Sequence, residues 1–318
     1  MTADVVIVTW RARDLTLRCL EHLAEQCAAG GHRLIVVDNA SGDGTPDAVA
    51  RRFPDVHLIE MEDNVGFGRA ANAGAAAGTR PAVVLVNNDV FAEDGFVDAL
   101  VAPLAADDRV GSVAGLTLQP RADGAADGAD VVDAFGIELD ATLTAYNRLR
   151  HRAPEPDAAG VLAGPSGGAA AYRRAAWDQV GGFDDRLFAY GEDVDLALRL
   201  RLAGWTAAAA PAARGVHLGG ATTGIDSPLQ RRLAGFQRGF LLRRYGVLRS
   251  RAAARALAFE ALIVMYGLVR FRATEPLAGR IAGWRAAAAR GGRLPIPDGA
   301  VDRSITAREQ LRRAREER

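Results

Sequence analysis

Three polar side chains stand at or just beyond the ends of short apolar runs, where they could gather around one ligand. Thr9 follows VVIV, Asp38 follows LIVV, and Asp89 follows VVLV with two asparagines between. Apolar runs without polar alternation are typical of strands buried on both faces of a parallel sheet. Ligands of such sheets bind beyond the carboxyl ends of the strands. The sequence therefore predicts one rim for all three residues, where two carboxylates suit a metal–nucleotide ligand better than a packing role.

Asp89 is the first candidate for a metal ligand. It follows Asn87 and Asn88 at the expected end of a strand. Hard divalent cations take oxygen ligands and keep room for substrate phosphates. A structural alternative makes Asp89 a cap for the next helix, but Glu93 and Asp94 can already serve as that cap. We therefore favour the metal role.

Asparagines gather in the same part of the chain. The chain has six, and five of them fall between residues 39 and 88: Asn39, Asn64, Asn72, Asn87 and Asn88. Turns and caps use asparagine, yet other small polar residues serve there as well. Asp38 likewise has two interpretations: it either opens a turn or accepts a hydrogen bond from the base or ribose of a nucleotide. The concentration of amides at strand ends favours a binding role for this region.

A second acidic group stands at the start of an expected helix, in Gly191-Glu192-Asp193-Val194-Asp195. Carboxylates in a first turn complement the helix dipole, and Asp195 with Arg199 forms an i,i+4 pair. Three acids exceed what capping needs. Repulsion between them can keep one of them able to accept a proton near neutral pH, which suits a general base.

His217 lies among glycines in GVHLGG, in what we expect to be a loop. A single histidine is usually structural, but little local core is available to hold this one. A structural role and a metal-ligand role both remain open for it.

A glycine motif offers a rival function. Gly66-x-Gly68-x-x-Ala71 matches the dinucleotide fingerprint, and Asp89 follows at a suitable distance for a ribose-binding acid. However, the motif follows the third strand rather than the first, and acidic residues precede it. We prefer a small-residue helix packed tightly on the sheet, with Asn64 and Arg69 near the ligand.

Alternating strands and helices must position these residues. Expected strands are 5–10, 33–38, 56–61, 82–87 and 110–118, and expected helices are 14–28, 45–52, 66–77 and 94–105. This alternation predicts an α/β fold with a doubly wound, mostly parallel sheet flanked by helices. An excursion with a short hairpin over 135–146 follows, and then strand 169–173, helices 174–180 and 192–203, and strand 205–210. We expect a first domain over 1–224 and a helical C-terminal extension over 225–318, with its tail after Ser304 solvated.

Composition narrows the functional classes. The 318 residues are 49% hydrophobic, and 39 basic residues balance 39 acidic ones, which gives no general reason to expect a nucleic-acid partner. No signal sequence is expected, and Cys19 and Cys27 read as buried thiols, so we expect a cytoplasmic protein. The apolar stretch 252–271 contains charges and should not span a membrane. Arginines around the C-terminal helices, in a chain without lysine, indicate either a solvated face, which we favour, or peripheral contact with the inner face of the plasma membrane. Self-association is a further partner hypothesis.

The assembled motifs resemble the inverting family-2 glycosyltransferases of GT-A fold, in particular their bacterial rhamnosyltransferase-like branch. The matching stretches span residues 5 to 220 in the order of the family: VVIVTW, IVVDNASGDGT, NVGFGRAANAG, VLVNNDV, GGAAAYRRAAWDQVGGFDDRLFAYGEDVDLALRLRLAGW and GVHLGG. This ordered set is far more specific than any one motif.

The resemblance implies a role for each candidate residue. The implied nucleotide-binding residues are Thr9, Trp10, Asp38, Asn39, Asn64, Arg69 and Asn88. The implied metal ligands are Asp89 and His217, for Mg²⁺ or Mn²⁺, although Asn87 stands where the Asp-x-Asp motif of the family has its first acid. Asp193 would be the catalytic base with Glu192 assisting, while Gly167, Gly168 and Tyr190 would face the sugar or the acceptor.

The implied reaction moves a sugar, L-rhamnose from dTDP-L-rhamnose in this branch, to a hydroxyl of a glycan or polyprenyl-linked glycan. Two alternatives stay open at this point. One is an NAD-type oxidoreductase that uses the Gly66 motif, and the other is a non-catalytic protein that binds sugar nucleotides.

Overall fold

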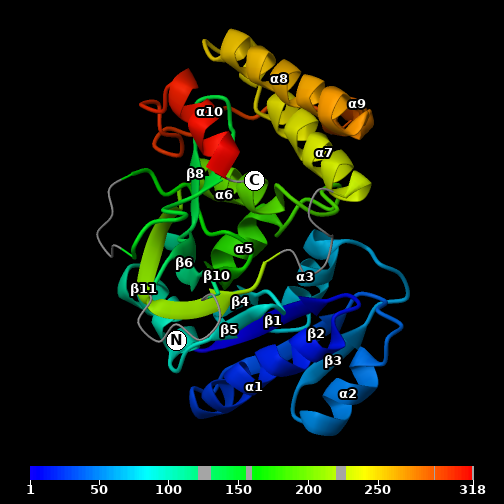
Figure 1. Ribbon diagram of the computed structural model, residues 1–318. Coiled ribbons are helices and arrows are strands. Elements are labelled where there is room, and N and C mark those ends of the chain that lie inside the picture. Colours follow the sequence, from blue (N-terminus) through cyan, green and yellow to red (C-terminus); the bar gives the residue numbers. More distant parts are fainter. Residues whose placement is uncertain (121–129, 155–159, 220–226, 290, 317–318) are drawn as a thin grey trace.

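The protein is described by a computed structural model over residues 1–120, 130–154, 160–219, 227–289 and 291–316. A twisted nine-stranded sheet lies between helices (Figure 1), so the expected α/β fold is confirmed. The strands are β1 Ala3–Thr9, β2 Arg33–Asp38, β3 His57–Glu60, β4 Ala82–Val86, β5 Val90–Ala92, β6 Val110–Leu118, β7 Val132–Ala134, β8 Ile137–Leu139, β9 Ala145–Asn147, β10 Ala169–Arg173 and β11 Thr206–His217. The helices are α1 Arg13–Ala29, α2 Thr45–Arg52, α3 Phe67–Ala76, α4 Phe96–Ala106, α5 Arg174–Val180, α6 Glu192–Leu202, α7 Pro228–Arg244, the 3₁₀ helix η1 Val247–Arg249, α8 Ala253–Phe271, α9 Glu275–Ala289 and α10 Ala307–Glu316.

The strand order of the main sheet is β3-β2-β1-β4-β10-β6-β11-β5, with β7 paired to β6. Strands β3, β2, β1 and β4 are parallel, and the register of β1 with β2 sets Thr9 beside Asp38. Strand β10 runs antiparallel between β4 and β6, because the chain enters it from the long excursion rather than through a crossover helix. Among the described strands, the main sheet is mixed, with four parallel and four antiparallel pairings. The expected parallel arrangement holds for β3, β2, β1 and β4, and the rim of the sheet collects the polar strand ends.

Apolar side chains cover both faces of the sheet. Residues of α1 and α4, such as Leu20 and Phe96, form one core, and residues of α3, α5 and α6 form the other. The small-residue helix α3 packs closely, because a Cβ on Gly74 would come within 2.4 Å of Val6. Cys19 and Cys27 are buried thiols on α1, as predicted.

Two strand predictions need correction. Strand β11 runs to His217 instead of ending at 210, because it pairs with β6 and then with the short strand β5. His217 thus lies at the end of a strand, not in a loop. Strand β5 was not predicted, since three residues carry too little periodicity to identify a strand. The hairpin expected over 135–146 is present as the antiparallel pair β8–β9.

The C-terminal helices form the end of the molecule opposite α1 and α2 (Figure 1). Helices α7 and α9 cross at glycines, and a Cβ on Gly239 would lie 2.0 Å from the Arg280 carbonyl oxygen. Residues of α6 and α7 share one hydrophobic cluster, which includes Val194 and Phe240. The division into domains 1–224 and 225–318 stays a prediction.

Two expectations for the C-terminal extension need correction, although its tail after Ser304 is helical over α10, as expected. The segment between α9 and α10 is not helical where the structure describes it. Helix α10 is docked, because Gln310 is buried and donates to Thr142 and Thr144, while Arg313 pairs with Glu138. No helix in the described part of the chain has the length and apolar character needed to cross a membrane.

Candidate active site

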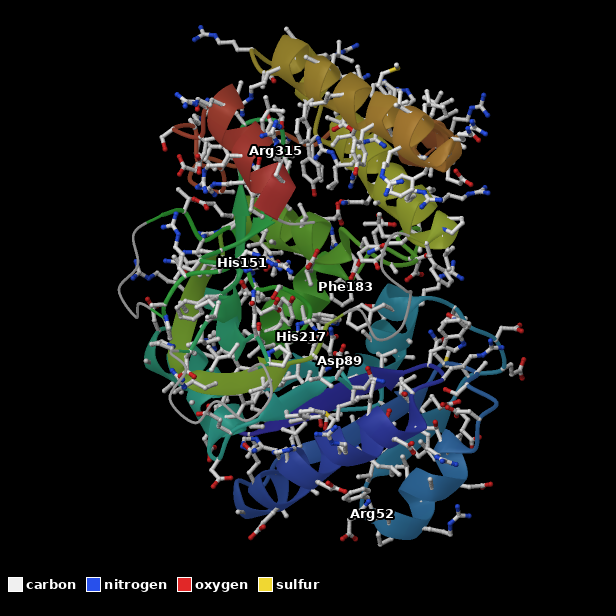
Figure 2. The ribbon with its side chains drawn as sticks, viewed as in Figure 1. Arg52, Asp89, His151, Phe183, His217 and Arg315 are labelled. Atoms are coloured by element: carbon white, nitrogen blue, oxygen red, sulfur yellow. The ribbon has the colours of Figure 1, made fainter. Side chains whose placement is uncertain are left out.

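Asp89 and His217 meet at the rim of the sheet (Figure 2). Strand β5 pairs with the end of β11, which brings His217 Nε2 to 3.2 Å from Asp89 Oδ1. The other ring nitrogen, Nδ1, lies 2.7 Å from Oδ2 of Asp133 on β7. Sequence reasoning missed Asp133, because it lies in the long excursion and no motif surrounds it. The histidine is therefore held between two carboxylates, one in the turn before β5 and one on β7.

This arrangement favours the charged imidazole while no cation is bound. Burial opposes the charge, but hydrogen bonds to Asp133 and Asp89 outweigh it and raise the pKa of His217 to about 9. Burial also opposes ionisation of Asp133, yet the His217 ring and Arg150 lower the pKa of that carboxyl. A divalent cation would take the place of the proton on Nε2.

The donor atoms fit a cation that is shared with a ligand. Among the described residues there is no group of three or more His, Cys, Asp or Glu arranged as a closed metal site. Mg²⁺-type sites often use only one or two protein ligands, with phosphate oxygens and water completing the shell. Histidine ligands commonly donate their second N–H to a carboxylate, which is the geometry of His217 with Asp133. Asp89 and His217 could hold such a cation.

Asp38 stands at the end of β2 with one carboxylate oxygen engaged. Its Oδ2 accepts the backbone N–H of Ser41 at 3.0 Å, while Oδ1 is buried without a hydrogen-bond partner. An orphaned buried oxygen is costly unless a ligand satisfies it. One oxygen of Asp38 therefore shapes the turn, and the binding role of the other oxygen stays a prediction.

Thr9 and Asn88 are brought together, but their polar atoms bind within the protein. Asn88 Nδ2 lies 3.2 Å from Thr9 Oγ1, and Thr9 Oγ1 lies 2.7 Å from the hydroxyl of Thr16 on α1. Trp10 follows on the rim and is half-buried beneath the Arg11 guanidinium, whose centre is 5.0 Å from its ring. Thr9 and Asn88 thus fix the Asp89 turn to β1.

Asn39 and Asn64 also bind each other. Asn39 Nδ2 donates to Asn64 Oδ1 at 3.0 Å, and the side-chain oxygen Oδ1 of Asn39 accepts the N–H of Val65 at 3.0 Å. These amides brace the loop before α3 against the end of β2. Exposed Arg69 donates to the Asp185 carbonyl oxygen at 3.2 Å.

The glycine motif accommodates protein rather than pyrophosphate. Gly66 has a φ of 86°, and a Cβ there would lie 2.3 Å from the Phe188 carbonyl oxygen. The N–H of Phe67 donates to that same oxygen at 2.7 Å. A dinucleotide would need this N–H and this space. The contact removes the physical basis of the oxidoreductase alternative.

Glu192 and Asp193 begin α6 side by side with perturbed acidities. Burial and the neighbouring Asp193 charge raise the pKa of Glu192 to about 8, and burial raises the pKa of Asp193 against hydrogen bonds from the N–H groups of Val194 and Gly167. Glu192 Oε2 is buried without a hydrogen-bond partner. Such a pair can hold one proton near neutral pH.

The segment Gly167–Gly168 links the two acidic groups. Gly167 contacts Asp193 through its N–H, and the Gly168 carbonyl accepts the N–H of Asn87 at 3.1 Å, which begins the turn to Asp89. A Cβ on Gly167 would meet only the Phe67 ring, at 3.6 Å, and neither glycine has a positive φ. The protein itself therefore has room for larger residues here, which is consistent with space kept for a ligand.

Helix α6 is oriented by a buried ion pair. The predicted pair is present, with Arg199 Nε 2.6 Å from Asp195 Oδ2, and the hydroxyl of Tyr245, the residue that follows α7, donates to Asp195 Oδ1 at 2.8 Å. Tyr190 precedes the helix with a left-handed φ of 69°, a conformation that costs free energy in a residue with a side chain. Sequence reasoning missed Tyr245, whose partner is fifty residues away.

Known proteins resemble this chain in sequence and in fold. Residues 3–235 match the family model described as glycosyltransferase like family 2. An N-acetylglucosaminyl-diphospho-decaprenol L-rhamnosyltransferase of Mycobacterium tuberculosis is 33% identical over 214 residues, which are 61% of this chain and 68% of that protein.

Two solved structures share the fold. A mannosyltransferase of Pyrobaculum calidifontis, in complex with GDP-Man and Mn²⁺, has a TM-score of 0.54 at 20% identity, over 91% of this chain and 88% of its own. GalNAc-T7 with UDP, GalNAc and Mn²⁺ has a TM-score of 0.59 at 15% identity, over 91% of this chain and 56% of its own. These neighbours confirm the GT-A fold. The chain is a glycosyltransferase and belongs to glycosyltransferase family 2.

Proposed function

We propose that this enzyme transfers L-rhamnose from dTDP-L-rhamnose, with inversion at the anomeric carbon, to a hydroxyl of a polyprenyl-diphosphate-linked glycan. The donor and the type of acceptor follow the M. tuberculosis relative, which is named as an L-rhamnosyltransferase acting on N-acetylglucosaminyl-diphospho-decaprenol. The observation that carries the proposal is the pairing of Asp89 with His217 beside the Asn87–Gly168 contact that leads to Asp193.

The residues of the rim bind and orient the donor. Asp38 Oδ1, buried and without a partner, accepts the N–H of the pyrimidine base or a ribose hydroxyl. Asp89 and His217 hold Mg²⁺ or Mn²⁺, as both neighbouring structures contain Mn²⁺. The chemistry that this cation supplies when bound is charge neutralisation on the departing nucleoside diphosphate.

The residues at the start of α6 move the proton. Asp193, as carboxylate, accepts the proton of the acceptor hydroxyl while that oxygen attacks the anomeric carbon from the face opposite the diphosphate. The C–O bond to the diphosphate breaks as the new glycosidic bond forms, so a single displacement inverts the configuration. Glu192 tunes the acidity of Asp193 or contacts the acceptor, and Gly167 lets the backbone approach the sugar.

The surface of α8 supports peripheral binding of the enzyme to the cytoplasmic face of an anionic membrane. Leu262, Met265 and Val269 are exposed on one face of this helix, and Val269 is 77% exposed. Arg270 and Arg272 flank this apolar face and complement anionic headgroups. A lipid-linked acceptor would be presented at such a surface.

A donor screen tests the proposal. The purified enzyme is given dTDP-L-rhamnose, UDP-sugars or GDP-mannose with Mn²⁺ and a short-chain lipid-diphosphate N-acetylglucosamine acceptor, and products are identified by mass spectrometry. We expect a rhamnosylated product whose formation stops with chelator and with Asp193→Asn. Transfer from a different donor would replace the rhamnose assignment, and transfer that Asp193→Asn leaves intact would refute the role of Asp193.

A further inference from the structure

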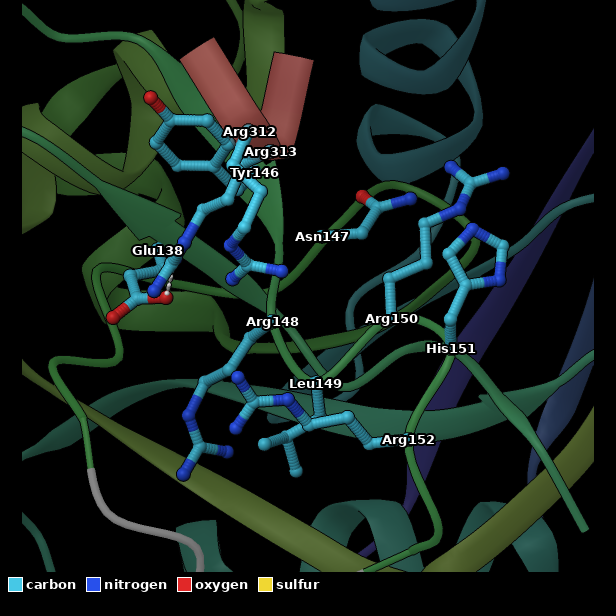
Figure 3. Close-up of a pocket in the computed structure, with 10 residues that line it drawn as sticks. All are labelled: Glu138, Tyr146, Asn147, Arg148, Leu149, Arg150, His151, Arg152, Arg312 and Arg313. Carbon is cyan, nitrogen blue, oxygen red and sulfur yellow. Dashed lines mark hydrogen bonds and ion pairs between the residues drawn. The ribbon is translucent and has the colours of Figure 1, made fainter. Parts of the chain in front are cut away.

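An arginine-lined cavity of about 200 Å³ lies between the segment that follows β9 and helix α10 (Figure 3). Its described lining includes five arginines and a single carboxylate, Glu138. The arginines are Arg148, Arg150, Arg152, Arg312 and Arg313. Two further acids pair with these arginines from outside the lining, Asp133 with Arg150 and Glu309 with the two arginines of α10. Guanidinium groups match the geometry of phosphate oxygens, so a cavity lined by five of them suits a phosphate or diphosphate.

The cavity adjoins the candidate metal site. Arg150 lies 3.8 Å from Asp133, and Asp133 holds the ring of His217. Figure 3 shows Arg150 and His151 lying close together on one wall, with Arg148 and Arg152 on the same segment. An anion bound here would therefore lie close to the proposed site of the donor diphosphate, but it would contact the arginines and not Asp89 or His217.

An apolar cavity of about 330 Å³ begins on the other side of Tyr146, which lines both cavities. Its walls include Phe259, Ile263 and Phe271. Gln237, another lining residue, lies against Gly191, where a Cβ would approach its Oε1 to 2.5 Å. The apolar cavity is thus one side chain away from the start of α6, where Glu192 and Asp193 lie.

We propose that these two adjoining cavities hold the lipid diphosphate of the acceptor, with the diphosphate among the arginines and the first isoprene units beside Phe259 and Ile263. The two cavities adjoin at one residue, so a ligand that fills both needs a charged head group joined directly to an apolar chain. That residue, Tyr146, lies under the guanidinium of Arg313 at 5.2 Å. This inference rests on the proposed function, because it locates the acceptor of that reaction.

Binding of soluble probes tests the diphosphate part. Inorganic pyrophosphate is titrated by calorimetry in the presence of chelator, so that the metal-dependent donor site is silent. Arg152 and Arg312 are exposed at the cavity, so the double variant R152Q/R312Q keeps the fold, and we expect it to bind pyrophosphate at least about tenfold more weakly. Arg51→Gln on the distant helix α2 is the matched control and should bind within about twofold of wild type. Equal binding by R152Q/R312Q and Arg51→Gln would overturn the assignment.

A titration with farnesyl diphosphate distinguishes a site for a lipid diphosphate from a site for free diphosphate. Farnesyl diphosphate should bind the wild-type protein about tenfold or more tightly than pyrophosphate, because its chain adds apolar contact. Ala234→Phe fills the apolar cavity and should remove this advantage while pyrophosphate binding stays; Ala254→Phe, at an exposed position of α8, should change neither. If farnesyl diphosphate bound no better than pyrophosphate, or if Ala234→Phe had no effect, the lipid assignment would be wrong.

A third titration distinguishes failure of this inference from failure of the proposed function. Binding of dTDP with Mn²⁺ and hydrolysis of dTDP-L-rhamnose without acceptor report on the donor site alone. R152Q/R312Q should leave both within about twofold of wild type, since its side chains do not touch Asp89 or His217. Loss of both in R152Q/R312Q would mean that these arginines serve the donor, and would overturn the acceptor assignment. If the wild-type protein neither bound dTDP with Mn²⁺ nor hydrolysed dTDP-L-rhamnose, the donor proposal would be refuted, whatever the result with pyrophosphate and farnesyl diphosphate.

Discussion

At the scale of single residues, the site depends on carboxylates that control the state of a neighbour. Asp133 binds one ring nitrogen of His217, and the other ring nitrogen lies 3.2 Å from Asp89, where the proposed cation would bind. Carboxylate partners of this kind set the tautomer and the orientation of a ligand histidine. We therefore expect Asp133 to act through His217 rather than on substrate.

Asp133→Asn should weaken Mn²⁺ binding by roughly 10- to 100-fold, because the amide no longer favours the ring orientation that directs Nε2 at the cation. Calorimetric titration of Mn²⁺ into the protein in the presence of dTDP measures this change. Asp130→Asn is the matched control, since Asp130 pairs with Arg214 at 2.5 Å instead. Equal Mn²⁺ affinity in both variants would show that Asp133 has no part in the metal site.

Glu192→Gln should leave the acidic limb of the pH profile of kcat/KM within roughly half a pH unit of wild type. Burial and the neighbouring charge of Asp193 raise the pKa of Glu192 to about 8, so Glu192 is protonated and uncharged at the lower pH where Asp193 titrates. The neutral amide reproduces this state, and the pKa of Asp193 stays raised by burial. The profile is measured with saturating Mn²⁺, and a limb that moves downward by roughly one pH unit or more would show that Glu192 is charged there and would contradict this assignment of the proton.

At the scale of elements, strand pairing and helix packing position the two acidic groups that the Gly167–Gly168 segment links. Strand β5 brings Asp89 to His217, and the Asp195–Arg199–Tyr245 contacts fix α6 against α7. The C-terminal helices contribute through close packing, because Gly235 and Gly239 of α7 face α9 at backbone distance. Helix α7 therefore supports the helix that carries the proposed base.

Gly239→Ala should lower the free energy of unfolding by about 1–3 kcal/mol, since the added Cβ would lie 2.0 Å from the Arg280 carbonyl oxygen and force α7 and α9 apart. Denaturant unfolding measures the change. Gly292→Ala is the control, because a Cβ there meets no atom within 4 Å and should change stability by less than about 0.5 kcal/mol. If Gly239→Ala were as stable as Gly292→Ala, the crossing would not be as close as described.

At the scale of the whole molecule, distinct surfaces are directed to distinct partners. The rim of the sheet holds the proposed nucleotide site, the arginine-lined cavity adjoins it, and helix α8, which carries exposed apolar side chains, lies at the far end of the molecule from α2 (Figure 1). A lipid-linked acceptor could thus reach the site from a membrane surface while the donor enters from solvent.

Met265→Asp/Val269→Asp should reduce co-sedimentation with vesicles containing anionic phosphatidylglycerol by about tenfold, because two carboxylates replace exposed apolar side chains among arginines. Vesicles of neutral phosphatidylcholine should bind wild type weakly, and added salt should weaken anionic binding. The matched control, Leu229→Asp, changes an exposed residue at the start of α7. Equal sedimentation of the double variant and wild type would leave α8 without a role at membranes.

Much of the architecture and of the site followed from local sequence. The apolar runs before Thr9, Asp38 and Asp89 predicted strands of a mostly parallel sheet, because burial on both faces is visible within a few residues. The identity of Asp89 and His217 as partners came from the ordered motifs of the family resemblance, and the structure places them 3.2 Å apart. Their role as metal ligands stays a prediction.

Only the tertiary structure decided what depends on distant segments. The antiparallel insertion of β10, the pairing of β5 with β11, the hold of Asp133 on His217 and the arginine-lined cavity join residues that no local window contains. Burial likewise gave Asp38 its unsatisfied oxygen and raised the pKa of Glu192. Residue type and periodicity specify which side chains are available, whereas desolvation and contact act through space and exist only once the chain has folded.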